Sequence, residues 1–173
     1  NYCVVDLTTL DGLSKFPVHY MDELEGDVSS SEYKTTHILL KKVHAGSFKM
    51  NGTYNVRLSE DFYVGVYEVT IGQWNSVTGE SKGTLGGKGD GYDYPVQSVS
   101  YDQIRGVREG AAWPMSDAVD ENSFVGLLRK KTNLNFDLPT EAQWEYSCRA
   151  GTITEYNHVD ADVGQPYESF GNL

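Results

Sequence analysis

The chain has 173 residues, of which 39% are hydrophobic and 23% charged, and its formal net charge is −11. This length suits one domain with a sizeable core, and the 12 tyrosines and 18 glycines indicate a globular, loop-rich protein. The negative charge excludes a surface for nucleic acid or an anionic membrane, and no apolar run reaches the roughly 18 to 20 residues of a spanning helix.

The first residues are predicted to form a strand, followed by a polar lead. Residues 2–7, YCVVDL, are mostly β-branched or aromatic, whereas residues 8–34 are polar and interrupted by glycine and proline. We therefore divide the chain into an extended lead segment, 1–34, and a folded domain, 35–173. The strand either closes the domain's own sheet or reaches a neighbouring molecule.

Four strands are predicted next, followed later by a short fifth one. Their sequences are HILLKKVHAG, SFKM, YNVRL, DFYVGVYEV and, at residues 95–99, PVQSV. In the fourth, Phe62, Val64 and Val66 recur at every second position, which is the period of a strand.

Three predicted helices begin with a capping box, in which a Ser or Thr side chain and a Gln three residues later bond to each other's backbone amides. The pairs are Thr70 with Gln73, Ser100 with Gln103, and Thr140 with Gln143. Gly79 ends the first of these helices and Gly151 the last. Apolar spacing predicts another helix from about Asp120 to Thr132, with Asp120 as its cap.

The stretch FDLPTEAQWEYSCRAG, residues 136–151, carries groups that catalysis could use. Glu141 and Glu145 share one helix face, as an acid–base pair or a metal site requires. The same residues also have structural roles. Glu141 lies where a helix N-terminus stabilises negative charge, and Glu145 is spaced for an ion pair with Arg149. We expect the structural roles to apply.

Two cysteines are too few for a disulfide framework. Cys3 and Cys148 either form one disulfide, if the first strand lies beside the last helix, or stay separate as buried thiols, which is the alternative we favour. Catalysis by Cys148 is disfavoured because the last turn of a helix opposes a thiolate.

Calcium is the metal for which the sequence offers ligands, on two acidic loops. The carboxylates are Asp90 and Asp93 in GDGYDY, and Asp160 and Asp162 in HVDADVG. Neither loop follows the EF-hand register, and solvated acidic loops are the alternative that we favour.

Several features suggest an extracytoplasmic protein, secreted or at the cell surface. The chain opens on Asn1 rather than methionine, which leads us to expect that an upstream segment was removed, either a signal peptide or the front of a longer chain. Tyrosine, threonine, serine and glycine are abundant, as in exported proteins. Asn51 also begins Asn51-Gly52-Thr53, a formal glycosylation sequon in a predicted turn.

Four stretches occur in an order that matches a known family. They are AGSFKM, DFYVGVYEVTIGQW, PVQSVSYDQI and FDLPTEAQWEYSCRAG. Together they resemble the formylglycine-generating enzymes, also called sulfatase-modifying factor domains, over residues 36–156. The resemblance implies an α+β domain, a variant of the C-type lectin fold that is rich in loops and packs short helices around small antiparallel sheets. Members of this superfamily oxidise a protein cysteine to formylglycine, catalyse iron-dependent thiol chemistry, or display ligands without catalysis.

The resemblance covers only the N-terminal part of the family domain. In the oxidases, the paired cysteines that bind copper follow a tryptophan-rich segment near the domain's end, and this sequence matches neither feature. Asp137 stands where the oxidases commonly have arginine, and Asn51 where glycine is usual.

We therefore expect a non-catalytic extracellular structural or binding module. Its expected partners are copies of itself, joined head to tail into a filament through residues 2–7, or a protein or carbohydrate ligand. For a carbohydrate, Tyr92, Tyr94 and Tyr101 offer stacking surfaces. The alternative is the front part of a formylglycine-generating oxidase, or of a related non-haem iron enzyme, with its catalytic segment outside this chain.

Overall fold

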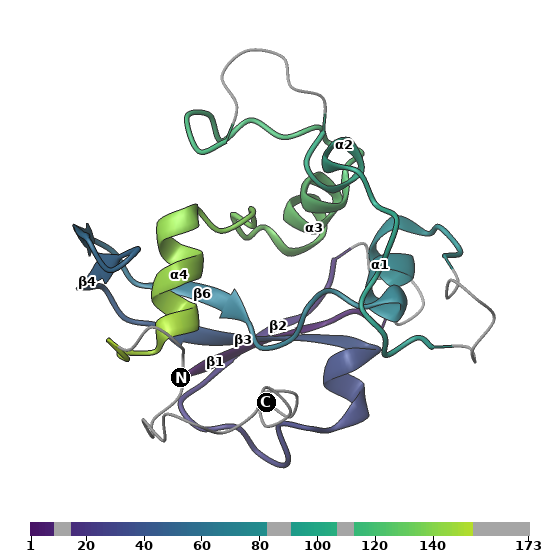
Figure 1. Cartoon of the computed structure of the whole chain (residues 1–173). Coiled ribbons are helices and arrows are strands. Elements are labelled where there is room, and N and C mark those ends of the chain that lie inside the picture. Colours follow the sequence, from purple (N-terminus) through teal and green to yellow (C-terminus); the bar gives the residue numbers. More distant parts are fainter. Residues whose placement is uncertain (9–14, 83–90, 107–112, 154–173) are drawn as a thin grey trace, which may run out of the picture.

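The structure is a computed structural model that describes residues 1–8, 15–82, 91–106 and 113–153 (Figure 1). The elements in chain order are β1 (Tyr2–Asp6), β2 (Val18–Met21), the 3₁₀ helix η1 (Ser31–Lys34), β3 (His37–Val43), β4 (Gly46–Met50), β5 (Tyr54–Leu58), β6 (Phe62–Gly65), α1 (Ile71–Thr78), α2 (Tyr101–Ile104), α3 (Phe124–Thr132) and α4 (Glu141–Arg149). No helix in these ranges has the length and apolar character needed to cross a membrane.

Four strands form an antiparallel sheet in the order β2-β1-β3-β6, and β4 and β5 form a separate hairpin. β1 lies inside the sheet, because Cys3 is opposite Tyr20 of β2 on one side and Leu40 of β3 on the other. The N-terminal strand thus closes the domain's own sheet, the first of the two predicted alternatives. The division of the chain at residue 35 stays a prediction, although β1, β2 and η1 from the lead segment all belong to this fold.

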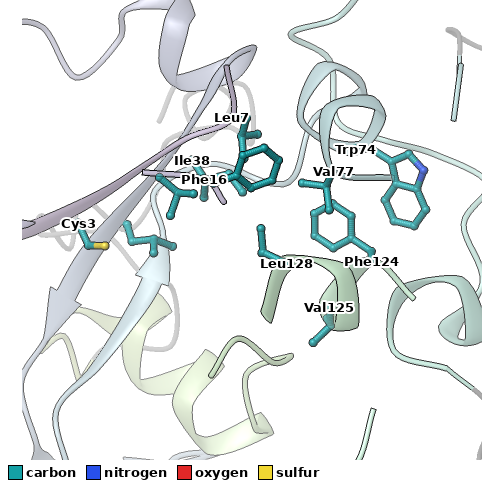
Figure 2. Packing of buried hydrophobic residues seen from close by; sticks show 11 residues of the cluster. Cys3, Leu7, Phe16, Ile38, Trp74, Val77, Phe124, Val125 and Leu128 are labelled. Atoms are coloured by element: carbon teal, nitrogen blue, oxygen red, sulfur yellow. The ribbon is translucent and has the colours of Figure 1, made fainter. Parts of the chain in front are cut away.

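The two faces of the sheet carry separate apolar clusters, because successive side chains of a strand point to opposite sides. The larger cluster joins β1 and β3 to α1 and α3 through Cys3, Val5, Leu7, Phe16, Ile38, Leu40, Trp74, Val77, Phe124, Val125 and Leu128 (Figure 2). Trp74 stacks on Phe124, with ring centroids 4.9 Å apart. On the other face, Val4 and Leu39 pack with Tyr33 of η1. Burial on both faces explains why β1 is almost continuously apolar.

All three predicted capping boxes are present. The box of α1 is buried and does more than cap the helix. Gln73 Oε1 accepts the Thr70 N–H at 3.0 Å, while Gln73 Nε2 donates to the carbonyls of Tyr33 at 3.0 Å and His37 at 2.6 Å. One side chain therefore fastens the start of α1 to the end of η1 and the start of β3.

The α3 helix begins later than predicted. Its N-cap is Ser123, whose hydroxyl accepts the Gly126 N–H at 3.1 Å. Asp120, the expected cap, instead accepts the Asn122 N–H at 2.8 Å in the preceding turn. Both residue types cap helices, and the chain uses the one next to the first apolar residue, Phe124.

The strand predicted at residues 95–99 is also wrong. Only an isolated bridge joins Pro95 to Thr70. Ser98 has φ 54°, a left-handed conformation that breaks the extended backbone of a strand.

Candidate functional site

Helix α4 packs on the β4–β5 hairpin, next to which it lies in Figure 1. Residues of β4 alternate, so that Phe48 is half-buried while Ser47 and Lys49 are exposed. The rings of Phe48 and Tyr146 have centroids 5.2 Å apart. A side chain at Gly46 would collide with the Tyr146 hydroxyl. The helix therefore rests on a surface that glycine and phenylalanine shape together.

Glu145 fastens this helix to the turn of the hairpin. Its Oε1 accepts the Asn51 N–H at 2.9 Å and Arg149 Nε at 2.7 Å, so the predicted Glu145–Arg149 ion pair forms. The Arg149 hydrogen bond and then the Asn51 N–H lower the pKa of Glu145 from its ordinary value. Both donors favour the ionised carboxylate, whereas a general acid needs a proton to give near working pH. Glu141 lies in the first turn of α4, as predicted, and its side chain is exposed.

The two cysteines are not joined by a disulfide. Cys3 is 1% exposed and packs in the sheet core, where burial raises the pKa of its thiol. Cys148 is exposed, so the expectation of a buried or disulfide-bonded Cys148 is wrong. It lies one turn from Trp144, which is 61% exposed. Glu145 and Tyr146 of the same helix contact the hairpin.

The calcium site stays a prediction, because only one of its four expected ligands lies within the described ranges. Asp90, Asp160 and Asp162 lie outside these ranges, and Asp93 is exposed on a turn. Across residues 1–8, 15–82, 91–106 and 113–153, no group of three or more His, Cys, Asp or Glu side chains could hold a metal ion.

A buried charge cluster centred on Asp137 was missed by the sequence analysis. Asp137 accepts Arg105 Nε at 2.7 Å and Nη2 at 3.0 Å, and it accepts Arg129 Nη2 at 2.9 Å. The Leu138 N–H also donates to it at 2.8 Å. The side chains of Asp137 and Arg105 are only 8% and 6% exposed. Asp137 thus has its own arginine partners at the position where the oxidases commonly carry arginine.

The same guanidinium groups also hold the surrounding loops. Arg105 Nη2 donates to the Ser116 carbonyl at 2.6 Å. Arg129 donates to the carbonyls of Phe136 at 2.6 Å and Asp117 at 2.9 Å. The cluster therefore connects α2, the loop after residue 113, α3 and the segment that leads into α4.

Two of the three tyrosines singled out for stacking are displayed on the surface. Tyr92 and Tyr94 are 55% and 54% exposed, whereas Tyr101 is half-buried. Their backbone carbonyls are fixed, because the N–H of Gly72 donates to Tyr92 at 2.8 Å and that of Ile71 to Tyr94 at 2.9 Å. The start of α1 thus holds the backbone that carries two exposed aromatic rings.

The comparisons with known proteins agree with this architecture. A family model described as "Sulfatase-modifying factor enzyme 1-like domain" matches residues 26–172. Over 144 residues the chain is 33% identical to a protein named "Chaperone protein LppX" from Paenibacillus barcinonensis, an alignment that covers 71% of this chain and 49% of that protein. The chain thus spans about half the length of this curated relative. No solved structure matches the chain.

The family match covers most of the chain and contains the capping boxes, the Asp137 cluster and α4. Short helices around small antiparallel sheets form the loop-rich, C-type-lectin-like α+β fold of this family. The chain therefore belongs to the sulfatase-modifying factor family, whose members include the formylglycine-generating enzymes.

Proposed function

We propose that this chain is a non-catalytic, extracytoplasmic binding module of the family, and that its partner is a protein. One observation carries the proposal: Glu145, the most conspicuous ionisable group of the α4 segment, holds two parts of the fold together. Its carboxylate binds one donor within α4 and one in the hairpin turn. A residue bound in this way serves as a structural acceptor.

The Asp137 cluster supports the same interpretation. An active-site carboxylate needs room for a substrate or a metal beside it. Asp137 is instead covered and accepts hydrogen bonds from two arginines and a backbone amide. The Asp137 cluster holds the loops around α3 in place through buried side chains. Contacts with a partner are therefore made by other side chains, those on the surface.

A protein partner is favoured by the relative and by the surface. The relative is named as a chaperone protein, a class that acts by binding other proteins. On α4, the side chain of Trp144 is 61% exposed. Tryptophan and tyrosine supply large contact areas at low entropic cost and are enriched at the energetic centres of interfaces. We place the binding surface over the exposed face of α4, with Trp144 at its centre.

A chaperone assay on the whole chain tests this proposal. A chemically unfolded enzyme is diluted into buffer with increasing amounts of the chain, and its aggregation is followed by light scattering. We expect suppression near equimolar amounts and its weakening in Trp144→Ala. Lys49→Ala, on the exposed side of the hairpin, is the matched control and is expected to behave like the parent chain. Undiminished aggregation at every ratio would contradict a chaperone-like function.

The enzyme alternative is tested on the same preparation. The chain is incubated with copper or iron, oxygen and a peptide that contains cysteine, and the peptide is examined for an aldehyde. Stoichiometric metal binding with aldehyde formation would favour the oxidase and overturn the non-catalytic proposal.

Self-assembly through β1 remains a second proposal, and it now takes the form of strand exchange. Residues 3–5 are buried and β1 is paired on both sides, so β1 has to leave its own sheet before it can pair with a neighbouring one. Light scattering coupled to size exclusion, before and after incubation near the unfolding midpoint, detects exchanged oligomers. A monomer under both conditions would contradict this proposal.

A further inference from the structure

We propose that Asn51 is a site of spontaneous deamidation and backbone isomerisation, and that the product loosens the β4–β5 hairpin from α4. The inference is independent of the proposed function. It rests on the Asn51-Gly52 turn and on the contact of that turn with Glu145.

Asn51 and Gly52 are the two central residues of the four-residue turn 50–53, which lies in the loop of the hairpin. Their φ angles are 50° and 67°, and the Thr53 N–H donates to the Met50 carbonyl at 3.0 Å. Two positive φ angles in succession are typical of a type I′ turn, which favours Asn-Gly. The turn therefore explains why asparagine and glycine occur together here.

The reacting groups are exposed and not engaged elsewhere. Asn51 and Gly52 are both exposed, and a side chain added at Gly52 would find no atom within 4 Å. Among the described residues, neither the Asn51 carboxamide nor the Gly52 N–H has a hydrogen-bond partner. Asn133 has a similar φ of 60°, but its Oδ1 accepts Lys15 Nζ at 2.7 Å and a leucine follows it.

The chemistry requires only water. The backbone nitrogen of Gly52 loses its proton to solvent base and attacks Cγ of Asn51. The new C–N bond closes a cyclic imide, and the side-chain nitrogen leaves as ammonia. Water then opens the imide at either carbonyl. One opening gives aspartate, and the other gives isoaspartate, in which the main chain runs through the former side chain. No oxidation or reduction occurs.

Both products disturb the contact with α4. The Asn51 N–H donates to Glu145 at 2.9 Å, so either product places a new carboxylate near an existing one. Isoaspartate also adds a methylene to the main chain of a turn whose ends are held by the pairing of Met50 with Tyr54. The longer turn therefore has to strain either the strand pairing of the hairpin or the hydrogen bond from residue 51 to Glu145.

The test is an ageing experiment on the full chain from a host that does not attach glycans. The protein is kept at mildly alkaline pH, and peptide mapping follows the exchange of amide for acid at each asparagine. Isoaspartate is identified by enzymatic methyl labelling. Asn55 is the internal control, because it is exposed and followed by Val56, whose branched side chain hinders attack. Asn51→Gly removes the reacting amide and keeps a residue suited to positive φ.

We expect Asn51 to convert several times faster than Asn55 and Asn133, with both acids formed. Aged protein is expected to lose hydrogen-exchange protection in β4, β5 and α4, while aged Asn51→Gly keeps it. If Asn51 converts no faster than Asn55, the proposal that Asn51 is a deamidation site is refuted. Conversion with unchanged protection in the hairpin and α4 would overturn its structural effect.

Discussion

Replacing Asp137 by alanine would leave two arginines without the carboxylate that they share. The side chains of Arg105 and Arg129 are 6% and 20% exposed, so water compensates Arg105 poorly and Arg129 in part. Removing one partner of a buried ion pair costs about 3 to 5 kcal/mol. The arginines keep their carbonyl acceptors, including Ser116 and Phe136, so we expect the lower part of this range.

That loss is large compared with a typical unfolding free energy of about 5 to 15 kcal/mol. Asp137→Asn keeps the shape and one acceptor oxygen and is expected to lose less, about 1.5 to 3 kcal/mol for hydrogen bonds to charged groups. The matched control is Asp93→Asn at an exposed turn, expected to change stability by less than about 0.5 kcal/mol.

Urea unfolding followed by tryptophan fluorescence measures these differences. The urea concentration at the midpoint of unfolding is expected to be highest for Asp93→Asn, lower for Asp137→Asn and lowest for Asp137→Ala. The dependence of the unfolding free energy on urea concentration is expected to be the same in all three variants. If Asp137→Ala loses less than about 1 kcal/mol, the cluster behaves like a surface ion pair and the argument from burial is refuted.

Three further predictions concern the contacts around α1 and α4. Gln73→Ala leaves buried backbone groups without a hydrogen-bond partner and is expected to lower the free energy of unfolding, measured in urea, by about 1 to 3 kcal/mol. Gln103→Ala, in an exposed capping box, is expected to lower it by less. Equal losses of stability in the two variants would contradict the role of burial. Because the folded-state pKa of Glu145 is lowered, its stabilisation is present above the unfolded-state pKa and is lost as pH falls through the folded-state pKa. Melting temperatures measured across acidic pH should therefore fall less steeply for Glu145→Gln, and parallel curves would argue against this. Gly46→Ala is expected to lower the free energy of unfolding in urea by about 1 kcal/mol, because the added methyl group meets the Tyr146 hydroxyl. The double variant Gly46→Ala/Tyr146→Phe is expected to recover part of this loss. If the losses of the two single variants simply add in the double variant, the hydroxyl is not the obstacle.

The helix starts of α1, α2 and α4 could be predicted because a capping box is contained within four consecutive residues. The start of α3 was less certain, since Asp120 and Ser123 carry the same local signal. Glu145 shows where local reasoning ends. Its pairing with Arg149 follows from helix spacing, but its contact with Asn51 joins positions 94 residues apart.

The Asp137 cluster and the place of β1 depend on tertiary structure in the same way. Arg105 lies 32 positions from Asp137, and nothing in the spacing connects them. An apolar strand at the N-terminus suits both an internal and an exchanged position, because either buries the same side chains. Only the pairing with β2 and β3 distinguishes the two.

The central claim is that the polar groups of α4 hold the fold together and catalyse no reaction. Mass spectrometry of a cysteine-containing peptide, incubated with the chain, oxygen and stoichiometric copper, tests it most directly. The account predicts that the peptide's thiol stays unchanged, and that Glu145→Gln alters only the melting behaviour of the chain. An aldehyde that forms with the parent chain and is lost in Glu145→Gln or Cys148→Ser, with the fold retained, would contradict it.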